Sequence, residues 1–279
     1  MEVDALVARL RAAGCVYAEE EAALLREAVP GGADGADGAG VERLVARRVG
    51  GEPLEQVLGW AAFAGLRVAV APGVFVPRRR TTLLVRLAVH ALEQAVRQAA
   101  EQTAQQAGRG PVLVDLCCGT GAVAAAVRAT VRPTLPAVEV HAADVDPAAV
   151  ACARHNLPPE VVHEGDLYAA LPGRLRGRVD VLVANAPYVP TADVALMPPE
   201  ARDHEHRVAL DGGDDGLAVQ RRVAAGLGPW LAPGATVVVE TGRHQADRTA
   251  VLLAAAGLAA EVVLDDEVEG CAVVGRARA

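Results

Sequence analysis

Hydrophobic positions follow helical spacing in the first part of the chain and form strand-like runs further on. In residues 3–29 apolar side chains recur every three to four positions, as in amphipathic helices. Residues 57–76 instead alternate apolar and polar positions, as in a β-hairpin. The pattern therefore predicts two short helices on either side of Gly14, a glycine-rich linker over 31–40, a helix over 41–49 and a hairpin turning at Ala71-Pro72-Gly73.

After residue 80 a long helical pattern over 81–107 is followed by short apolar runs that alternate with helical segments. Continuous apolar runs are typical of strands buried on both faces, and this alternation predicts an α/β fold with a mostly parallel sheet. The predicted strands span 112–116, 138–143, 161–163, 179–184 and 236–240, with a closing hairpin of 261–264 and 271–275. The predicted helices between them span 122–129, 148–156, 217–227 and 245–256.

The first of these strands runs into a glycine-bearing turn that ends at Gly121. Glycines let backbone approach a ligand, and the N-terminus of the following helix offers free N–H groups to a carboxylate or phosphate. Ala124 leaves a loose match to the nicotinamide fingerprint. Asp115, which we place inside the turn, would repel a pyrophosphate but attract an ammonium or sulfonium group. The turn therefore favours S-adenosylmethionine over NAD.

Polar residues follow the next strands at the edge where ligands of open α/β sheets bind. Asp144 can accept hydrogen bonds from both ribose hydroxyls, and Asp166 from an adenine amine. Asp146 is expected to cap the next helix rather than bind ligand. Asn185 follows the fourth strand, so the chain predicts a binding site built from successive strand ends.

Asn185 opens the segment Asn185-Ala186-Pro187-Tyr188. Its amide oxygen and the carbonyl of Ala186 can accept two N–H bonds from a planar NH2 group, and Tyr188 can cover the face of that group. Held by these two acceptors, the NH2 group would direct its nitrogen lone pair at an electrophile. The loop therefore predicts methyl transfer to nitrogen. The long connection that follows, 189–216, is of a length that is usually functional.

The order of these motifs resembles the class I S-adenosylmethionine-dependent methyltransferases, and more closely the HemK/PrmC-type protein-(glutamine-N5) methyltransferases. The resemblance covers residues 40–276. Besides the segments above, it is carried by the stretches 51–59, 63–68, 72–78, 209–217 and 239–245. The subgroup that it resembles best has Asn-Ala-Pro-Tyr in place of Asn-Pro-Pro-Tyr and an unassigned substrate.

The resemblance implies a seven-stranded Rossmann-like sheet in the order 3-2-1-4-5-7-6 with an antiparallel last strand. It also implies a small N-terminal helical, substrate-docking region (1–56), a linking β-hairpin (57–80) and a methyltransferase domain (81–279). The expected activity is methylation of a glutamine side chain, such as that of the Gly-Gly-Gln loop of release factors. S-adenosylmethionine would be the cofactor, S-adenosylhomocysteine the product, and a protein that presents the glutamine the partner.

Site residues are assigned on the same basis. The expected catalytic set is Asn185, Ala186, Pro187 and Tyr188. The expected cofactor-binding set is Asp115, Cys117, Gly119, Thr120 and Gly121, together with Asp144, Val145, Asp166, Leu167 and Asn185. The expected substrate rim is Phe75, Pro77, Arg78, Val189 and Pro190.

Two departures from the family pattern affect these expectations. Ala186 keeps the carbonyl acceptor but removes one of two prolines, so the loop is less preorganised. Arg79-Arg80-Thr81 stands where the family usually has Pro-Glu-Thr, so a base replaces an acid near the active site. Both changes touch the part of the protein that would select a partner.

Composition narrows the function classes. The net charge of −8, with no lysine among the 279 residues, opposes a nucleic-acid partner. Five scattered cysteines indicate reduced thiols and a cytoplasmic setting. Adjacent cysteines such as Cys117-Cys118 bridge a metal poorly and no Cys/His set surrounds them, and the segment with His204 and His206 is interpreted as a solvated loop, so no metal site is predicted. We expect no signal peptide and no membrane span.

Three alternatives stay open at this point. The enzyme could act on a nucleobase amine or a small-molecule amide, for which the Asn-Ala-Pro-Tyr loop would look the same. The chain could be a catalytically degenerate module that binds S-adenosylmethionine. A dinucleotide oxidoreductase is disfavoured by Asp115.

Overall fold

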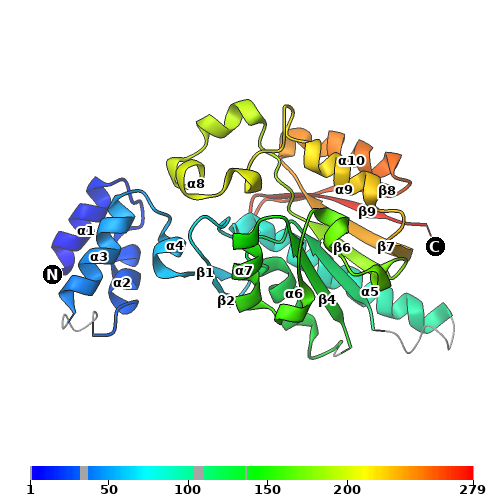
Figure 1. Cartoon of the computed structure of the whole chain (residues 1–279), viewed down its shortest axis with the longest axis horizontal. Coiled ribbons are helices and arrows are strands. Elements are labelled where there is room, and N and C mark those ends of the chain that lie inside the picture. The colour runs from blue at the N-terminus through cyan, green and yellow to red at the C-terminus, as the bar shows by residue number, and fades with distance from the viewer. Residues whose placement is uncertain (1, 32–36, 103–109, 136, 279) are drawn as a thin grey trace.

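The computed structural model describes residues 2–31, 37–102, 110–135 and 137–278, and its centre is one seven-stranded sheet (Figure 1). The strands lie in the order β5-β4-β3-β6-β7-β9-β8, and only β9 runs against the others. They are β3 (Val112–Leu116), β4 (Glu139–Asp144), β5 (Val162–Glu164), β6 (Val179–Ala184), β7 (Leu231–Glu240), β8 (Ala259–Asp265) and β9 (Gly270–Arg276). This order confirms the expected class I methyltransferase-type sheet.

Helices cover both faces of the sheet (Figure 1). One face carries α5 (Thr82–Gln102), α6 (Ala122–Val131) and α7 (Pro147–Asn156), and the other carries α9 (Ala218–Gly226) and α10 (Ala246–Ala255). Successive strand residues point to opposite faces, so Val181 and Val183 join the first core while Leu182 and Ala184 join the second. This two-sided burial explains the continuous apolar runs in the sequence. Of the long predicted helix, 103–107 lie outside the described residues.

Short 3₁₀ turns connect several of these elements. They are η1 (Arg79–Thr81), η2 (Pro159–Val161), η3 (Leu167–Ala170), η4 (Gly173–Leu175) and η7 (Arg243–Gln245). In the described ranges no helix is both long enough and apolar enough to cross a membrane.

The N-terminal helices form a separate layer with its own core, at the blue end of the ribbon (Figure 1). They are α1 (Val3–Ala12), α2 (Ala18–Glu27), α3 (Gly38–Val49) and α4 (Leu54–Leu58). The two predicted helices around Gly14 and the third helix are confirmed, while 32–36 of the predicted linker lie outside the described residues. The five-residue α4 was not predicted, because it is too short to show a helical period. The division into domains stays a prediction.

The hairpin is present, but its predicted turn at Ala71-Pro72-Gly73 is wrong. Strands β1 (Trp60–Phe63) and β2 (Leu66–Ala69) are joined by Ala64 and Gly65, both at positive φ (47° and 78°). Two positive-φ residues give the twist that a two-residue hairpin needs. Gly73 instead pairs with the loop after β6, where its carbonyl accepts the His206 N–H at 2.7 Å.

That loop, residues 189–216, is called the excursion here. It contains η5 (Thr191–Leu196), α8 (Pro199–His204) and η6 (Arg207–Ala209), and lies between the N-terminal helices and α10 (Figure 1). Arg48 of α3 pairs with Glu200 at 2.5 Å, and the Gln56 side chain donates to the His204 carbonyl at 3.0 Å. The excursion is therefore held by the N-terminal helices through Glu200 and His204, and by the segment after β2 through the bond of His206 to Gly73.

Candidate active site

A cavity of about 290 Å³ opens at the edge where β3, β4 and β6 end. Its walls combine the loops after these strands with the excursion, which contributes Met197, Val208, Ala209 and Leu210. Of the predicted cofactor set it is lined by Cys117, Gly119, Asp144, Val145, Asp166 and Leu167. All four residues of the predicted catalytic set also line it: Asn185, Ala186, Pro187 and Tyr188. The parallel sheet therefore brings predicted site residues up to 71 positions apart, from Cys117 to Tyr188, into one cavity.

The turn after β3 exposes its backbone to this cavity. Gly119 has a φ of 54°, and a Cβ there would meet no atom within 4 Å, so the open space is available to a ligand. Cys117 has a similar φ of 56°, which costs a residue with a side chain about 1–2 kcal/mol. Strain of this kind is typical of functional loops. The sequence did not lead us to expect this strained φ at Cys117. A glycine would adopt the same φ with less strain.

Asp144 connects this turn to β4. One carboxylate oxygen accepts the Gly119 N–H at 2.8 Å and the other accepts the Asp146 N–H at 3.0 Å. Each oxygen retains a lone pair for a ligand hydroxyl. Burial raises the pKa of the Asp144 carboxyl, against the lowering effect of these two N–H groups. Asp146 caps α7 as expected, accepting the Ala148 N–H at 2.9 Å, and also contacts His206 of the excursion at 2.6 Å.

The predicted position of Asp115 inside the turn is wrong. It belongs to β3, is 2% exposed, accepts the Ala124 N–H at 3.2 Å and does not line the cavity. Burial raises its pKa to about 7. The sequence indicated an acid before the glycines, but the pleat of the strand directs it toward α6. Thr120 and Gly121 also lie outside the cavity wall, where Gly121 (φ 72°) packs closely on α7.

Asp166 and Leu167 follow β5 on the far side of the cavity. Asp166 pairs with Arg222 of α9 at 2.5 Å, and both side chains are more than half exposed. The pair leaves carboxylate lone pairs free, so Asp166 can accept a further hydrogen bond. Leu167 takes a positive φ of 49° as the chain turns into η3.

The Asn185-Ala186-Pro187-Tyr188 loop begins directly after β6. Among the described residues, no hydrogen bond reaches the Asn185 carboxamide or the Ala186 carbonyl oxygen, while Ala186 itself is buried. Polar groups at a cavity wall without a protein partner are available to a ligand. The loop therefore offers the two acceptors that the sequence predicted.

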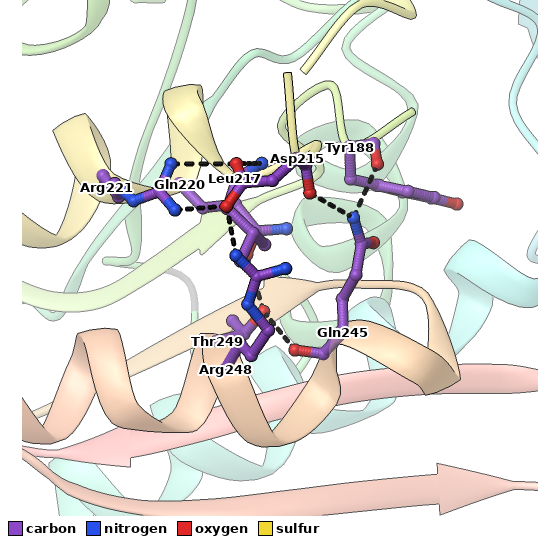
Figure 2. Close-up of polar contacts among 8 residues, drawn as sticks. All are labelled: Tyr188, Asp215, Leu217, Gln220, Arg221, Gln245, Arg248 and Thr249. Atoms are coloured by element: carbon purple, nitrogen blue, oxygen red, sulfur yellow. Dashed lines mark hydrogen bonds and ion pairs between the residues drawn. The ribbon is translucent and has the colours of Figure 1, made fainter. Parts of the chain in front are cut away.

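A hydrogen-bond network fixes the end of this loop (Figure 2). The Gln245 side chain donates to the carbonyls of Tyr188 at 3.0 Å and Asp215 at 3.2 Å. The Asp215 carboxylate is in turn held by Arg221 and Arg248, and these bonds hold its pKa far below the usual range. Asp215 of the stretch 209–217 and Gln245 of the stretch 239–245 are thus linked to the Tyr188 backbone.

Tyr188 stands next to an ion pair that sequence reasoning did not assemble. The buried Glu240 accepts from Arg80 Nε at 3.3 Å and from the Tyr188 hydroxyl at 3.4 Å. Arg80 lines the cavity, and burial raises the pKa of Tyr188 to about 12. Sequence comparison had marked Arg80 as unusual, but nothing in the sequence links it to Glu240, 160 residues away.

Only part of the predicted substrate rim lines the cavity. Phe75 and Val189 line the cavity, whereas Pro77, Arg78 and Pro190 do not. Arg78 instead pairs with the buried Glu205 of the excursion at 2.5 Å. Within the described ranges no group of three or more His, Cys, Asp or Glu side chains is arranged to hold a metal ion.

Comparisons with known proteins agree with this geometry. The family model for ribosomal protein L11 methyltransferase (PrmA) matches residues 81–189. A release factor glutamine methyltransferase of Streptomyces coelicolor is 38% identical over 199 residues, which are 71% of this chain and 65% of that protein. That of Bordetella pertussis is 36% identical over 220 residues, 77% of this chain and 74% of that protein.

Another relative has a different acceptor in its name. The 4-amino-L-phenylalanine/4-methylamino-L-phenylalanine methyltransferase of Streptomyces pristinaespiralis is 34% identical over 215 residues, 76% of this chain and 69% of that protein. Among solved structures, a methyltransferase from Pyrococcus furiosus is 14% identical, covers 84% of this chain and 98% of its own, and has a TM-score of 0.51, which shows the fold alone.

The matches to the first three release factor enzymes span 65–66% of their lengths, just under two thirds. The Bordetella pertussis match passes that share at more than 30% identity. The chain therefore belongs to the HemK/PrmC-type protein-(glutamine-N5) methyltransferase family, that of the release factor glutamine methyltransferases.

Proposed function

We propose that this protein transfers a methyl group from S-adenosylmethionine to the side-chain amide nitrogen of a glutamine in a protein substrate. The observation that carries the proposal is a pair of acceptors, the Asn185 carboxamide and the Ala186 carbonyl, that have no partner among the described residues and share one cavity with the Gly119 turn and Asp144. Relatives named for this reaction support it.

The cavity suits the cofactor. The open space at Gly119 allows close approach to backbone, and the two Asp144 oxygens have free lone pairs for vicinal hydroxyls. Asp166, which lines the same cavity, would accept from the exocyclic amine of the adenine. When bound, S-adenosylmethionine supplies an already activated methyl group, so the protein has mainly to position the acceptor.

Positioning falls to the Asn-Ala-Pro-Tyr loop. An amide nitrogen is a weak nucleophile because its lone pair is delocalised into the carbonyl. Acceptance of its two N–H bonds by Asn185 and Ala186 would raise electron density on nitrogen and orient it. Tyr188 would cover the planar group, and the apolar excursion residues Met197 and Leu210 would exclude water.

Asp144→Asn is expected to weaken S-adenosylmethionine binding by about 1–3 kcal/mol, because a charge-assisted bond to the ribose is lost. Isothermal titration calorimetry measures the change. Asp180→Asn is the matched control: Asp180 does not line this cavity, and an asparagine oxygen can still accept the Val112 N–H that Asp180 accepts at 2.8 Å, so its affinity should stay within about twofold. An unchanged affinity in Asp144→Asn would remove Asp144 from the cofactor site.

The acceptor itself is tested with labelled S-adenosylmethionine and a lysate of a strain that lacks this gene. Protein is separated from nucleic acid and small molecules, and the labelled protein is acid-hydrolysed. Label released as volatile methylamine is the expected result, because hydrolysis of an N5-methylglutamine frees its amide nitrogen with the methyl group. Label confined to nucleic acid or small molecules would contradict a protein substrate.

A second candidate is favoured by the Streptomyces pristinaespiralis relative, which is named for an amine on an aromatic amino acid. An arylamine is also a planar NH2 group, so the same two acceptors would hold it. Label in the small-molecule fraction of the lysate would support this alternative.

A further inference from the structure

Arg80 stands where two cavities meet. The second cavity, of about 540 Å³, lies at the ends of β7 and β9 and shares Arg80 and Tyr188 with the first. The predicted cofactor residues Gly119, Asp144 and Asp166 come from the opposite side of the site, after β3, β4 and β5. Arg80 therefore borders the path by which an acceptor would reach Asn185, rather than the predicted cofactor residues.

The other cations of the two cavities have partners on the cavity walls. Arg222 pairs with Asp166 in the first cavity, and Arg243 pairs with Asp266 at 2.6 Å in the second. The partner of Arg80 is Glu240, which lines neither cavity. Within the described residues, Arg80 is thus the cation of this passage whose paired acid lies behind the wall, so only its guanidinium faces the cavities; the other acids on the walls are Asp144 and Asp146 in the first cavity and Glu269 in the second.

The contact with Glu240 fixes Arg80 without using all its donors. Glu240 is 2% exposed and receives Nε at 3.3 Å, while the Arg80 side chain is 44% exposed. The guanidinium carbon also lies 6.0 Å from the centre of the Tyr188 ring. Arginine binds a carboxylate best through two parallel N–H bonds; Glu240 takes Nε, and the Tyr188 hydroxyl is the other partner of the guanidinium, so terminal N–H groups of Arg80 remain for a ligand.

We propose that Arg80 is a specificity-determining residue that binds a carboxylate of the methyl acceptor, close to the nitrogen that is methylated. The inference rests on the proposed function of the Asn185 loop. The carboxylate has two possible sources: an acidic residue beside the target glutamine in a polypeptide, or the α-carboxylate of a free amino acid. Both present the same group to Arg80, so the test includes an arm for each.

The test uses two matched pairs of acceptors with labelled S-adenosylmethionine. One pair is an end-blocked Gly-Gly-Gln-Asp peptide and its Gly-Gly-Gln-Asn counterpart, and the other is 4-aminophenylalanine and its carboxamide. The wild-type protein is expected to prefer the carboxylate member of one pair by at least tenfold in kcat/KM, mainly through KM. The pair that shows the preference identifies the source.

The variants then assign the preference to Arg80. Arg80→Gln should abolish it and Arg80→Glu should reverse it, whereas Arg79→Gln, an exposed neighbour outside both cavities, should leave it unchanged. Because Arg80→Gln leaves Glu240 buried without its cation, Arg80→Gln/Glu240→Gln is the second variant. Calorimetry with S-adenosylhomocysteine checks that each variant folds and binds.

Two results would overturn the inference alone. One is transfer to both members of a pair at equal kcat/KM in wild type and variants. The other is a loss of S-adenosylmethionine affinity in Arg80→Gln with the acceptor preference intact, which would assign Arg80 to the cofactor. No transfer to any of the four acceptors would instead refute the proposed function, and the inference with it.

Discussion

Asn185→Ala is expected to lower kcat by about 10²–10³-fold while S-adenosylmethionine affinity stays within a few-fold. The substitution removes the side-chain acceptor that would orient the target nitrogen, but no hydrogen bond within the described protein, because the Asn185 carboxamide makes none. Single-turnover methyl transfer and calorimetry separate the two effects. If Asn185→Ala retained most of the wild-type kcat, Asn185 would not be the residue that holds the NH2 group of the acceptor.

The chain offers a matched control in Asn156, its other asparagine. The Asn156 carboxamide is fully used: it accepts from the Ala69 N–H at 2.8 Å and donates to the carbonyls of Ala69 and Thr120 at 3.0 and 2.9 Å. Asn156→Ala should therefore lower the free energy of unfolding and, through the turn at Thr120, cofactor affinity. Its kcat at saturating cofactor should be close to that of the wild type.

Arg48→Met is expected to lower the free energy of unfolding by about 3–5 kcal/mol, because it leaves the buried carboxylate of Glu21 without a cation. Arg48 contacts both Glu21 oxygens, at 2.6 and 3.1 Å, and each side chain is 9% exposed. It also holds Glu200 of α8, so the excursion loses an anchor. Urea unfolding followed by circular dichroism measures the loss.

Two further variants make this prediction specific. Arg48→Met/Glu21→Leu removes the buried charge together with its partner and should recover most of the stability. Arg11→Met breaks the exposed pair with Glu19 and should leave the urea midpoint almost unchanged, because solvent screens that pair. If Arg48→Met and Arg11→Met unfolded at the same urea concentration, the buried pair would have no special part in joining the N-terminal helices to the excursion.

The sheet could be predicted because its signals are local. The strands β3 and β6 are mostly apolar runs of five and six residues, β4 ends in the apolar pair before Asp144, and a polar residue or glycine at or after each strand end marks the edge where ligands bind. Parallel strands bring these ends to the same edge, so Gly119, Asp144 and Asn185 were placed together before any contact was known. Sequence resemblance added the order of the strands.

Errors arose where a local signal allowed two structures. Pro72-Gly73 is a typical turn sequence, yet the hairpin turns at Ala64-Gly65. Strands β1 and β2 pair in a register that sets Trp60 opposite Ala69, and this register leaves Ala64 and Gly65 as the two turn residues. Asp115 stands one residue before the end of β3, so the strand pleat, rather than its distance from Gly119, decides which way it points. Periodicity shows which positions alternate but not which neighbour each side chain will meet.

The sequence by itself determined the class of fold, the edge of the sheet that carries the site and the loop that presents Asn185, because apolar runs, glycines and prolines act over a few residues. Only the tertiary structure decided the contacts of Arg80 with Glu240, of Arg48 with Glu200 and of Gln245 with the Tyr188 carbonyl. These partners are 57 to 160 residues apart. Such pairs form only when packing brings distant elements together, so the spacing of residues along the chain does not predict them.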